Sequence, residues 1–366
     1  MIAGGGTAGH ALPGIAVARA LVEAGHLAAS IHFVGSARGV EARLVPAAGF
    51  SVTVLPGRGI QRKLALANVG AVFGLLGAFA RALWLVGRLR PKVVLSLGGY
   101  ASVPCAMAAV VWRVPIVVAE QNAVPGAANR LVSRFAKAAA VSFPDTPLPR
   151  AVLTGNPVRA EVSAIGTGGE SEQRAARKRL DIDEARRVVL VFGGSLGALR
   201  INQAVLGAVR QWRDRKDLAV RHIVGDRDWE IVQAERPPLP PDGLQYQALR
   251  YDDDMATSLA VADLAVCRSG ATTSFELAAA GLPAVLVPSP NVVADHQTAN
   301  ARHMEACGGA VLVPDAQLDA DRLLAEVEAV LASPERLSKM AAAMRRFAAP
   351  DAAARVAAIV EEHARA

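Results

Sequence analysis

The fold is decided by residues 267–288, which read CRSGATTSFELAAAGLPAVLVP. An apolar strand ends at Cys267, a tight Ser-Gly turn follows, and a helical pattern then begins. Gly281 and Pro283 end that helix, because glycine suits a left-handed C-cap and proline cannot continue a helix. A second apolar strand completes a strand–helix–strand unit, the repeating element of a parallel α/β domain.

The start of this helix predicts a ligand site. The backbone N–H groups of Ala271, Thr272 and Thr273 fall in the first turn, where they have no carbonyl partner within the helix. Such groups bind phosphates, and Glu276 follows one turn later, within reach of the same ligand. We expect a hydroxyl-rich, phosphate-bearing molecule here, although every helix N-terminus of an α/β domain has unpaired N–H groups.

The same alternation of apolar runs and helical patterns continues through all 366 residues. It predicts parallel sheets covered by helices on both faces, and the length suggests two domains. We expect a very short first strand at residues 1–3 and a helix over residues 13–24 with Pro13 at its start. The proline-rich residues 144–159 are the predicted domain junction, and residues 166–173 a polar turn.

The composition is that of a globular protein, with 52% hydrophobic and 20% charged residues. Its three cysteines (Cys105, Cys267 and Cys307) show no CxxC spacing and cannot all pair, which is typical of a reducing cytoplasm. Only three residues precede the first glycine loop, so no signal peptide is expected.

Charge is distributed unevenly along the chain. Residues 42–119 contain no Asp or Glu and carry +9, so the rest of the chain sums to −2. A nucleic-acid groove would add aromatic residues for stacking, and aromatics are only 4% here, so no nucleic-acid partner is expected. The basic segment 43–113 instead predicts contact with an anionic membrane surface. Its nine bases are Arg43, Arg58, Arg62, Lys63, Arg81, Arg88, Arg90, Lys92 and Arg113.

Residues 64–80 within this segment form an apolar run of 17 residues that ends at Arg81. A helix needs ~20 apolar residues to span a bilayer. The run therefore predicts a buried or interfacial helix, which together with the loop at residues 56–63 would lie on the bilayer.

Three glycine-rich turns follow predicted strands, at residues 4–10, 98–100 and 193–195. Ligands of parallel sheets bind at this edge, where glycine lets the backbone approach a phosphate. The first turn, GGGTAGH, resembles the dinucleotide fingerprint, but the acid expected ~20 residues on is missing at the next strand end. The nearest acid, Glu23, precedes that strand, and none of the turns carries a Walker lysine, so neither NAD binding nor nucleotide hydrolysis is supported.

Two residues are candidate general bases. His10 closes the first glycine turn at a helix N-terminus, which disfavours the imidazolium ion and keeps the ring able to accept a proton. The alternative is a histidine that binds phosphate or caps the helix. Glu120 ends a predicted strand beside Gln121 and Asn122, and its alternative role is to orient an acceptor hydroxyl.

The acidic run at residues 252–254 could hold a metal, but no histidine pair with metal-ligand spacing surrounds it. Asp253 or Asp254 more simply caps the helix predicted at residues 255–261. We expect no metal and no cofactor.

Eight motifs in this order make the chain resemble the MurG family, the N-acetylglucosaminyltransferases of peptidoglycan synthesis. The resemblance covers essentially the whole chain. The motifs are GGGTAGHALPGIAVA (4–18), GGYAS (98–102), EQNAVPGAANR (120–130), GNPVR (155–159), GGSLGALRIN (193–202), YDDDMA (251–256), the stretch 267–288 and DHQTANA (295–301).

The resemblance implies the GT-B fold, in which two Rossmann-like parallel-sheet domains face each other across a cleft. Residues 1–158 would form the acceptor-binding, membrane-facing domain, with a last helix at residues 349–366 packing back on it. Residues 159–348 would bind the UDP-sugar. The protein would be peripheral, on the cytoplasmic face of the cell membrane.

The resemblance also implies the reaction, an inverting transfer of N-acetylglucosamine from UDP-N-acetylglucosamine to the 4-hydroxyl of lipid I without a metal. His10 or Glu120 would deprotonate the acceptor hydroxyl. Glu276 would bind the ribose, and Gln297 with His296 the sugar. The remaining donor contacts would come from Thr7, Ala8, Gly9, Asn122, Arg159, Ser195, Asp252, Ala271, Thr272, Thr273, Ser274 and Phe275.

The sequence departs from the family pattern in three ways. Ala8 replaces a glycine of the first turn, the first strand is short, and Asp252 stands where an apolar residue is common beside the uracil. If the side chain at position 252 packs on the base, nucleotide preference changes; if only the backbone contacts the base, it does not. A GT-B transferase with a soluble acceptor and a non-catalytic membrane scaffold are the competing functions.

Overall fold

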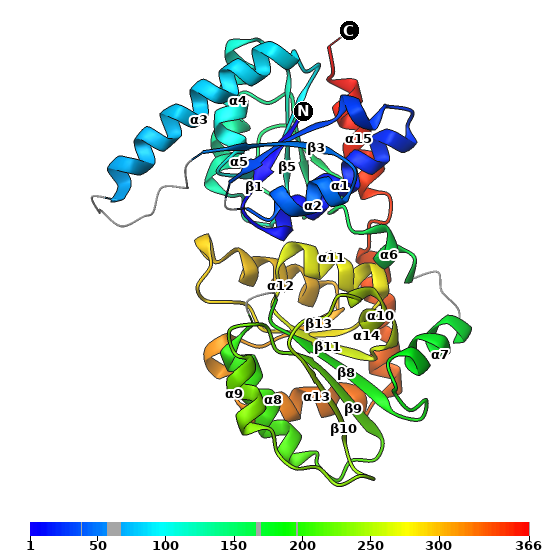
Figure 1. Cartoon of the computed structure of the whole chain (residues 1–366). Coiled ribbons are helices and arrows are strands. Elements are labelled where there is room, and N and C mark those ends of the chain that lie inside the picture. The colour runs from blue at the N-terminus through cyan, green and yellow to red at the C-terminus, as the bar shows by residue number, and fades with distance from the viewer. Residues whose placement is uncertain (38, 57–66, 166–169, 195–196, 366) are drawn as a thin grey trace. The chain divides into compact units, whose positions relative to one another are not determined.

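The computed structural model describes residues 1–37, 39–56, 67–165, 170–194 and 197–365 (Figure 1). The chain divides into two compact units. The N-terminal unit is Met1–Arg159 with Ala349–Ala366, and the C-terminal unit is Ala160–Ala348. Each unit is a parallel sheet with helices on both faces, as the alternating pattern predicted.

The N-terminal unit holds a seven-stranded parallel sheet in the order β3-β2-β1-β4-β5-β6-β7. Its strands are β1 (Ile2–Gly5), β2 (His32–Ser36), β3 (Ser51–Leu55), β4 (Val94–Gly99), β5 (Ile116–Glu120), β6 (Ala138–Val141) and β7 (Ala151–Leu153). Its helices are α1 (Ala8–Glu23), α2 (Glu41–Ala47), α3 (Ala67–Leu89), α4 (Ser102–Val111), α5 (Ala127–Val132) and α15 (Ala352–Glu362), with a 3-10 turn, η1 (Ala28–Ser30).

Alternate residues of these strands face two separate apolar cores, as the period of two requires. Ile2 and Leu95 pack with α1 and with α15, so the last helix of the chain belongs to this unit. Ala3 and Val94 point the other way and pack with α3 and α4.

The C-terminal unit repeats the plan with six parallel strands in the order β10-β9-β8-β11-β12-β13. The strands are β8 (Arg187–Phe192), β9 (Leu218–Ile223), β10 (Gln245–Leu249), β11 (Leu264–Cys267), β12 (Ala284–Leu286) and β13 (Ala310–Leu312). The helices are α6 (Ala160–Ser163), α7 (Glu170–Arg179), α8 (Leu199–Gln211), α9 (Trp229–Glu235), α10 (Met255–Val261), α11 (Ala271–Ala280), α12 (His296–Ala306), α13 (Ala320–Leu331) and α14 (Pro334–Phe347), with 3-10 turns η3 (Val293–Asp295) and η4 (Asp315–Gln317).

The strand–helix–strand segment of the opening motif forms as predicted. It comprises β11, α11 and β12, and β11 pairs with both β8 and β12 at the centre of the sheet. Gly281 is the left-handed C-cap of α11 at φ +64°, and the Arg345 guanidinium packs where a Cβ on this glycine would lie. Leu277 of α11 is fully buried; burying one such side chain stabilises the fold by about 1.5–3 kcal/mol.

Three expectations about local structure are wrong. The first strand is not confined to residues 1–3: β1 runs to Gly5 and is a central strand, buried between β2 and β4. The first helix begins at Ala8, directly after the extended Thr7, whose carbonyl accepts the Ala11 N–H, so Pro13 lies inside the helix. Helix α7 begins within the expected polar turn, at Glu170. The chain passes from one unit to the other after Arg159, at the end of the predicted junction, and residues 144–159 also contain the unpredicted strand β7.

A fully buried histidine of β9 joins this strand to β10 and to α8. The Nε2–H group of His222 donates to Asn202 Oδ1 at 2.9 Å, so its Nδ1 accepts the Tyr246 hydroxyl, also at 2.9 Å. Burial lowers the pKa of His222 from 6.5 to about 3. The ring is therefore neutral in the folded protein.

This buried histidine predicts a loss of stability in acid. Because protonation favours the unfolded chain, the stabilisation is complete above the unfolded pKa of 6.5 and falls as the pH drops towards 3. The slope approaches about 1.4 kcal/mol per pH unit. His222→Gln should flatten this slope in urea unfolding between pH 7 and 5, whereas His303→Gln, at a partly exposed histidine of the same unit, should not. Equal slopes for wild type and His222→Gln would contradict the assignment.

Candidate active site

Both sheets reverse their strand order at one point, and the predicted ligand loops lie there. In the N-terminal unit the reversal falls between β1 and β4, and in the C-terminal unit between β8 and β11. Ligands of parallel α/β sheets bind at the carboxyl ends of such strand pairs. The structure therefore places the glycine turns at residues 4–10, 98–100 and 193–194, and the turn before α11, at binding edges.

The N-terminus of α11 has the geometry of an anion site. Its first intrahelical hydrogen bond joins the Ser274 N–H to the Gly270 carbonyl at 2.9 Å, so the N–H groups of Ala271, Thr272 and Thr273 precede the helical bonding. The hydroxyls of Thr272 and Ser274 are buried and have no hydrogen-bond partner within the described part of the chain.

Glu276 lies one turn further on and is 9% exposed. It shares a helix face with Thr272, four residues earlier. The neighbouring Phe275 has a different role, because its buried ring packs on Phe347 with the centroids 5.3 Å apart. Of the predicted contacts from α11, Phe275 could therefore offer only its backbone.

The second predicted sugar-binding motif is held against this helix end. The Ser269 hydroxyl donates to the Gln297 carbonyl at 2.8 Å, and the Ser289 N–H donates to Gln297 Oε1 at 2.8 Å. His296 begins α12, and its Nδ1–H donates to the Val293 carbonyl at 2.8 Å. The structure thus brings residues 269–276 and 296–297 together, as the motif order implied.

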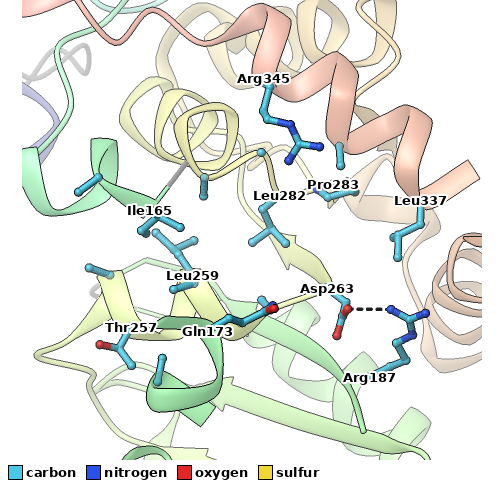
Figure 2. Close-up of a pocket in the computed structure, with 18 of the residues that line it drawn as sticks. Ile165, Gln173, Arg187, Thr257, Leu259, Asp263, Leu282, Pro283, Leu337 and Arg345 are labelled. Atoms are coloured by element: carbon cyan, nitrogen blue, oxygen red, sulfur yellow. Dashed lines mark hydrogen bonds and ion pairs between the residues drawn. The ribbon is translucent and has the colours of Figure 1, made fainter. Parts of the chain in front are cut away.

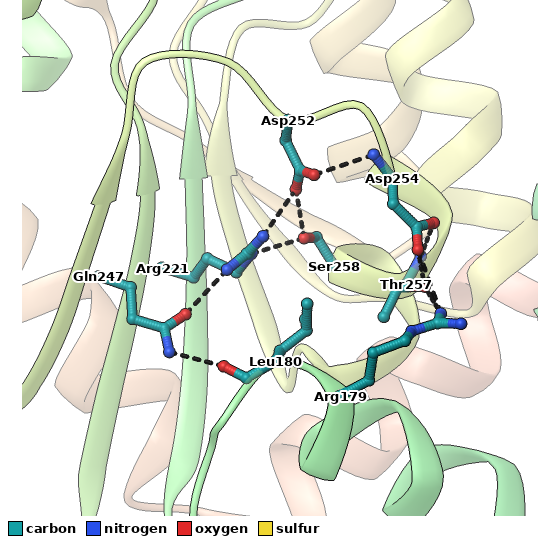
Figure 3. A network of polar contacts seen from close by, with 8 residues as sticks. All are labelled: Arg179, Leu180, Arg221, Gln247, Asp252, Asp254, Thr257 and Ser258. Atoms are coloured by element: carbon teal, nitrogen blue, oxygen red, sulfur yellow. Dashed lines mark hydrogen bonds and ion pairs between the residues drawn. The ribbon is translucent and has the colours of Figure 1, made fainter.

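Asp252 does not present its carboxylate to a ligand. Figure 3 shows it turned into the unit, where Oδ2 accepts from Arg221 at 3.2 Å and from Ser258 at 2.5 Å. Its Oδ1 accepts the Asp254 N–H at 3.0 Å. This position could contact a base through its backbone alone, so the acid in place of an apolar residue need not alter nucleotide preference.

Asp254 of the acidic run also has partners within the unit. Asp254 caps α10 by accepting the Thr257 N–H at 3.2 Å and pairs with Arg179 at 3.1 Å. This confirms the expected helix cap. Among the residues that the structure describes, no cluster of three metal-binding side chains exists.

The first glycine turn and α1 form the corresponding site of the N-terminal unit. Thr7 and Ala8 are exposed, and His10 is half-buried in the first turn of α1. The Thr7 hydroxyl lies 3.1 Å from His10 Nδ1. When His10 Nδ1–H donates to this hydroxyl, the ring lone pair is on Nε2, the tautomer that a base requires.

Glu120 is built into its loop. It is 3% exposed, and its Oε1 accepts from the Asn122 N–H at 3.0 Å and side-chain amide at 3.3 Å. Its Oε2 accepts from the Gly126 N–H at 3.0 Å and Asn129 Nδ2 at 2.9 Å. These four hydrogen bonds hold the loop that carries Asn122, a structural role of Glu120 that sequence reasoning did not predict.

The two turns at the N-terminal switch point touch each other closely. Gly99 has φ +77°, and a Cβ there would lie 2.1 Å from the Gly5 carbonyl oxygen, so only glycine fits. Beneath them lies Glu41, 3% exposed, whose Oε1 accepts the Gly6 N–H. Sequence reasoning missed Glu41 because it searched for an acid at the end of the next strand, and Glu41 lies five residues beyond Ser36, on α2.

Ser195 and Arg159 complete the set of predicted site residues. Ser195 lies outside the described residues. Arg159 is half-buried and directly precedes α6, at the point where the two units divide.

A pocket of about 820 Å³ in the C-terminal unit lies away from this site (Figure 2). It is lined by Arg187, at the start of β8, and by Asp263 and Pro283, which directly precede β11 and β12. These are the amino ends of the strands. The pocket therefore opens at the sheet edge opposite to the glycine turns.

Comparison with known proteins identifies the family. The N-terminal domain of glycosyltransferase family 28 matches residues 1–141, and its C-terminal domain matches residues 188–356. A protein of Alkalilimnicola ehrlichii is 41% identical over 366 residues, 100% of this chain and 99% of the relative. One of Frankia casuarinae is 41% identical over 371 residues, 100% and 95% of the two chains. Both are named UDP-N-acetylglucosamine--N-acetylmuramyl-(pentapeptide) pyrophosphoryl-undecaprenol N-acetylglucosamine transferase.

Solved structures agree with this result. The crystal structure of MurG from Acinetobacter baumannii matches with a TM-score of 0.78 at 30% identity, over 99% of both chains. A UDP-GlcNAc 2-epimerase from Neisseria meningitidis matches at 0.67 and 14% identity, which shows the fold alone. The two sheets and their ligand loops are those of a glycosyltransferase with the GT-B fold. The chain belongs to glycosyltransferase family 28.

The buried Arg221–Asp252 pair predicts a specific stability pattern. Both side chains are under 10% exposed, at 7% and 6%. Arg221→Met or Asp252→Leu alone leaves a buried charge unpaired and should cost about 3–5 kcal/mol. The double variant should recover most of this loss in chemical unfolding.

The exposed Arg250–Asp226 pair on the same unit is the control, with side chains 56% and 66% exposed. Its single variants should cost less than about 1 kcal/mol. Strictly additive losses at positions 221 and 252 would show that the pair is not coupled.

Proposed function

We propose that this protein transfers N-acetylglucosamine from UDP-N-acetylglucosamine to the 4-hydroxyl of the N-acetylmuramyl sugar of lipid I, giving lipid II for peptidoglycan synthesis. The observation that carries this proposal is the full-length identity of 41% to relatives named for that reaction. The site geometry of both units supports it.

The C-terminal unit binds the donor in this proposal. The N–H groups of Ala271, Thr272 and Thr273 bind the diphosphate of UDP. Glu276 binds the ribose hydroxyls, and Gln297 the sugar. A helix N-terminus stabilises the negative charge that develops on the departing UDP, so the mechanism needs no metal.

The N-terminal unit supplies the base. His10 Nε2 takes the proton of the acceptor hydroxyl while its oxygen attacks C1 of the sugar and the C1–O bond to UDP breaks. Attack from the face opposite to UDP inverts the anomeric carbon. Thr7 holds the required tautomer through His10 Nδ1, and Glu120 acts on the loop of Asn122 and does not exchange protons.

The membrane surface of the proposal comprises the exposed apolar and basic residues of α3 and the end of α4. Leu76, Trp84 and Leu89 of α3 are 59%, 57% and 41% exposed. Trp112, 48% exposed, joins α4 to α3 through its indole N–H, which donates to the Leu83 carbonyl at 3.0 Å. The exposed bases of this surface are Arg81, Arg88, Arg90 and Arg113.

This surface suits peripheral contact with anionic lipid on the cytoplasmic leaflet, where the acceptor lies. The Arg88 guanidinium lies 5.3 Å from the Trp84 ring centroid, so a charge and an amphipathic ring are presented side by side. No helix of the described ranges meets the length and apolarity that crossing a membrane requires.

Two variants test the site with a lipid I analogue and radiolabelled UDP-N-acetylglucosamine. His10→Ala removes the base and should lower kcat about 10²- to 10⁴-fold with little change in the donor KM. Glu276→Ala removes a charged hydrogen bond to the donor and should raise its KM about 10- to 100-fold. His26→Ala, at an exposed histidine beyond the other end of α1, is the control. Wild-type kinetics in both site variants would refute the assignment.

Vesicle co-sedimentation tests the membrane surface. Trp84→Ser should weaken binding to vesicles that contain anionic phospholipid about 10-fold or more, because burial of a large apolar side chain contributes about 1.5–3 kcal/mol. Leu27→Ser, at a 76% exposed position outside this surface, should have no effect. Equal binding of all three proteins would mean that α3 does not contact the bilayer.

A further inference from the structure

The proposed mechanism leaves Glu41 unused, and its surroundings are unusual. It is the first residue of α2 and is 3% exposed, beneath the turn that joins β1 to α1. Its Oε1 accepts the Gly6 N–H at 2.5 Å, and the backbone N–H groups of Ser36 and of Glu41 itself also bond to the carboxylate. One carboxylate therefore joins the carboxyl ends of two neighbouring strands.

Three glycines leave the space that this carboxylate occupies. A Cβ on Gly5 would lie 2.9 Å from Glu41 Oε1, and one on Gly35 would lie 2.9 Å from Glu41 Cβ. A Cβ on Gly39 would lie 1.7 Å from Oε2. The backbone of β1, of β2 and of the following turn is thus shaped around a single side chain.

Apart from Glu41, little in the sequence of this turn restricts its backbone conformation. Residues 4–6 are all glycine, which has more backbone freedom to lose than any other residue, and Gly6 has φ +111°. Gly6 carries no side chain that could anchor it, and its N–H is the group that Glu41 binds. Burial raises the pKa of the Glu41 carboxyl group, and its hydrogen bonds from backbone N–H groups act in the opposite direction.

Thr7 and the first turn of α1, with His10, follow Gly6 directly. We propose that Glu41 is a positioning residue that fixes the Gly6 turn and thereby aims His10 at the acceptor hydroxyl. This inference rests on the proposed function for the role of His10. An apolar side chain could fill the same space, but it could not accept the Gly6 N–H.

Two conservative variants distinguish the effect of side-chain length at position 41 from the effect of its charge. Glu41→Gln keeps an oxygen at the position of Oε1 and should retain kcat within about fivefold of wild type. Glu41→Asp keeps the charge but is one methylene shorter, so it cannot reach Gly6. It should lower kcat about 10- to 100-fold, since small misplacements of a catalytic group cost up to about 10²-fold. The donor KM should be unchanged in both, and Glu23→Asp, on the exposed end of α1, is the control.

Hydrogen–deuterium exchange of the peptide spanning residues 1–15 gives a readout independent of activity. Exchange should be faster in Glu41→Asp than in Glu41→Gln or wild type. Equal kcat in the two variants, or equal exchange, would overturn the proposal. So would a fall in kcat that only parallels a loss of thermal stability in both. If wild type transfers no sugar to a lipid I analogue, the proposed function fails, and the exchange result still decides whether Glu41 holds the turn.

Discussion

The structure depends on one constraint, that the backbone N–H groups beyond the carboxyl ends of parallel strands need partners. In each unit the chain reverses its strand order once, and the turns on either side of that point leave N–H groups in the first turn of a helix. At α11 the N–H groups of Ala271, Thr272 and Thr273 are of this kind. In the proposed function the diphosphate of the donor accepts hydrogen bonds from these groups.

Three buried acidic side chains hold the backbone of loops near these sites. Glu120, Asp252 and Glu41 are each under 10% exposed, and each accepts backbone N–H groups from the loop that it holds. A buried carboxylate without partners would be costly, so these contacts are made together or not at all. The consequence is that three acids near the carboxyl ends of the strands are used to position backbone, and the proposed roles in base catalysis and ribose binding fall to His10 and Glu276.

Much of this could be predicted from the sequence, and the misses have identifiable causes. The parallel sheets, the end of α11 at Gly281 and the cap at Asp254 followed from period, glycine and short-range polar signals. The start of α1 was missed because Pro13 is a strong local signal for a helix start, whereas the helix already begins at Ala8, after the extended Thr7. Strand β7 was missed because its exposed residues pair along only one edge, with β6, in a proline-rich stretch.

What the sequence by itself determined is therefore local or periodic: the strand–helix–strand unit at residues 267–288, the glycine turns, the acid-free basic segment and the family motifs. Only the tertiary structure decided which carboxylates face a ligand and which are turned inward. Asp252 meets Arg221 from a different strand, and Glu41 meets Gly6 from 35 residues away. Such pairings depend on how strands are ordered in the sheet, and no short-range pattern encodes that order.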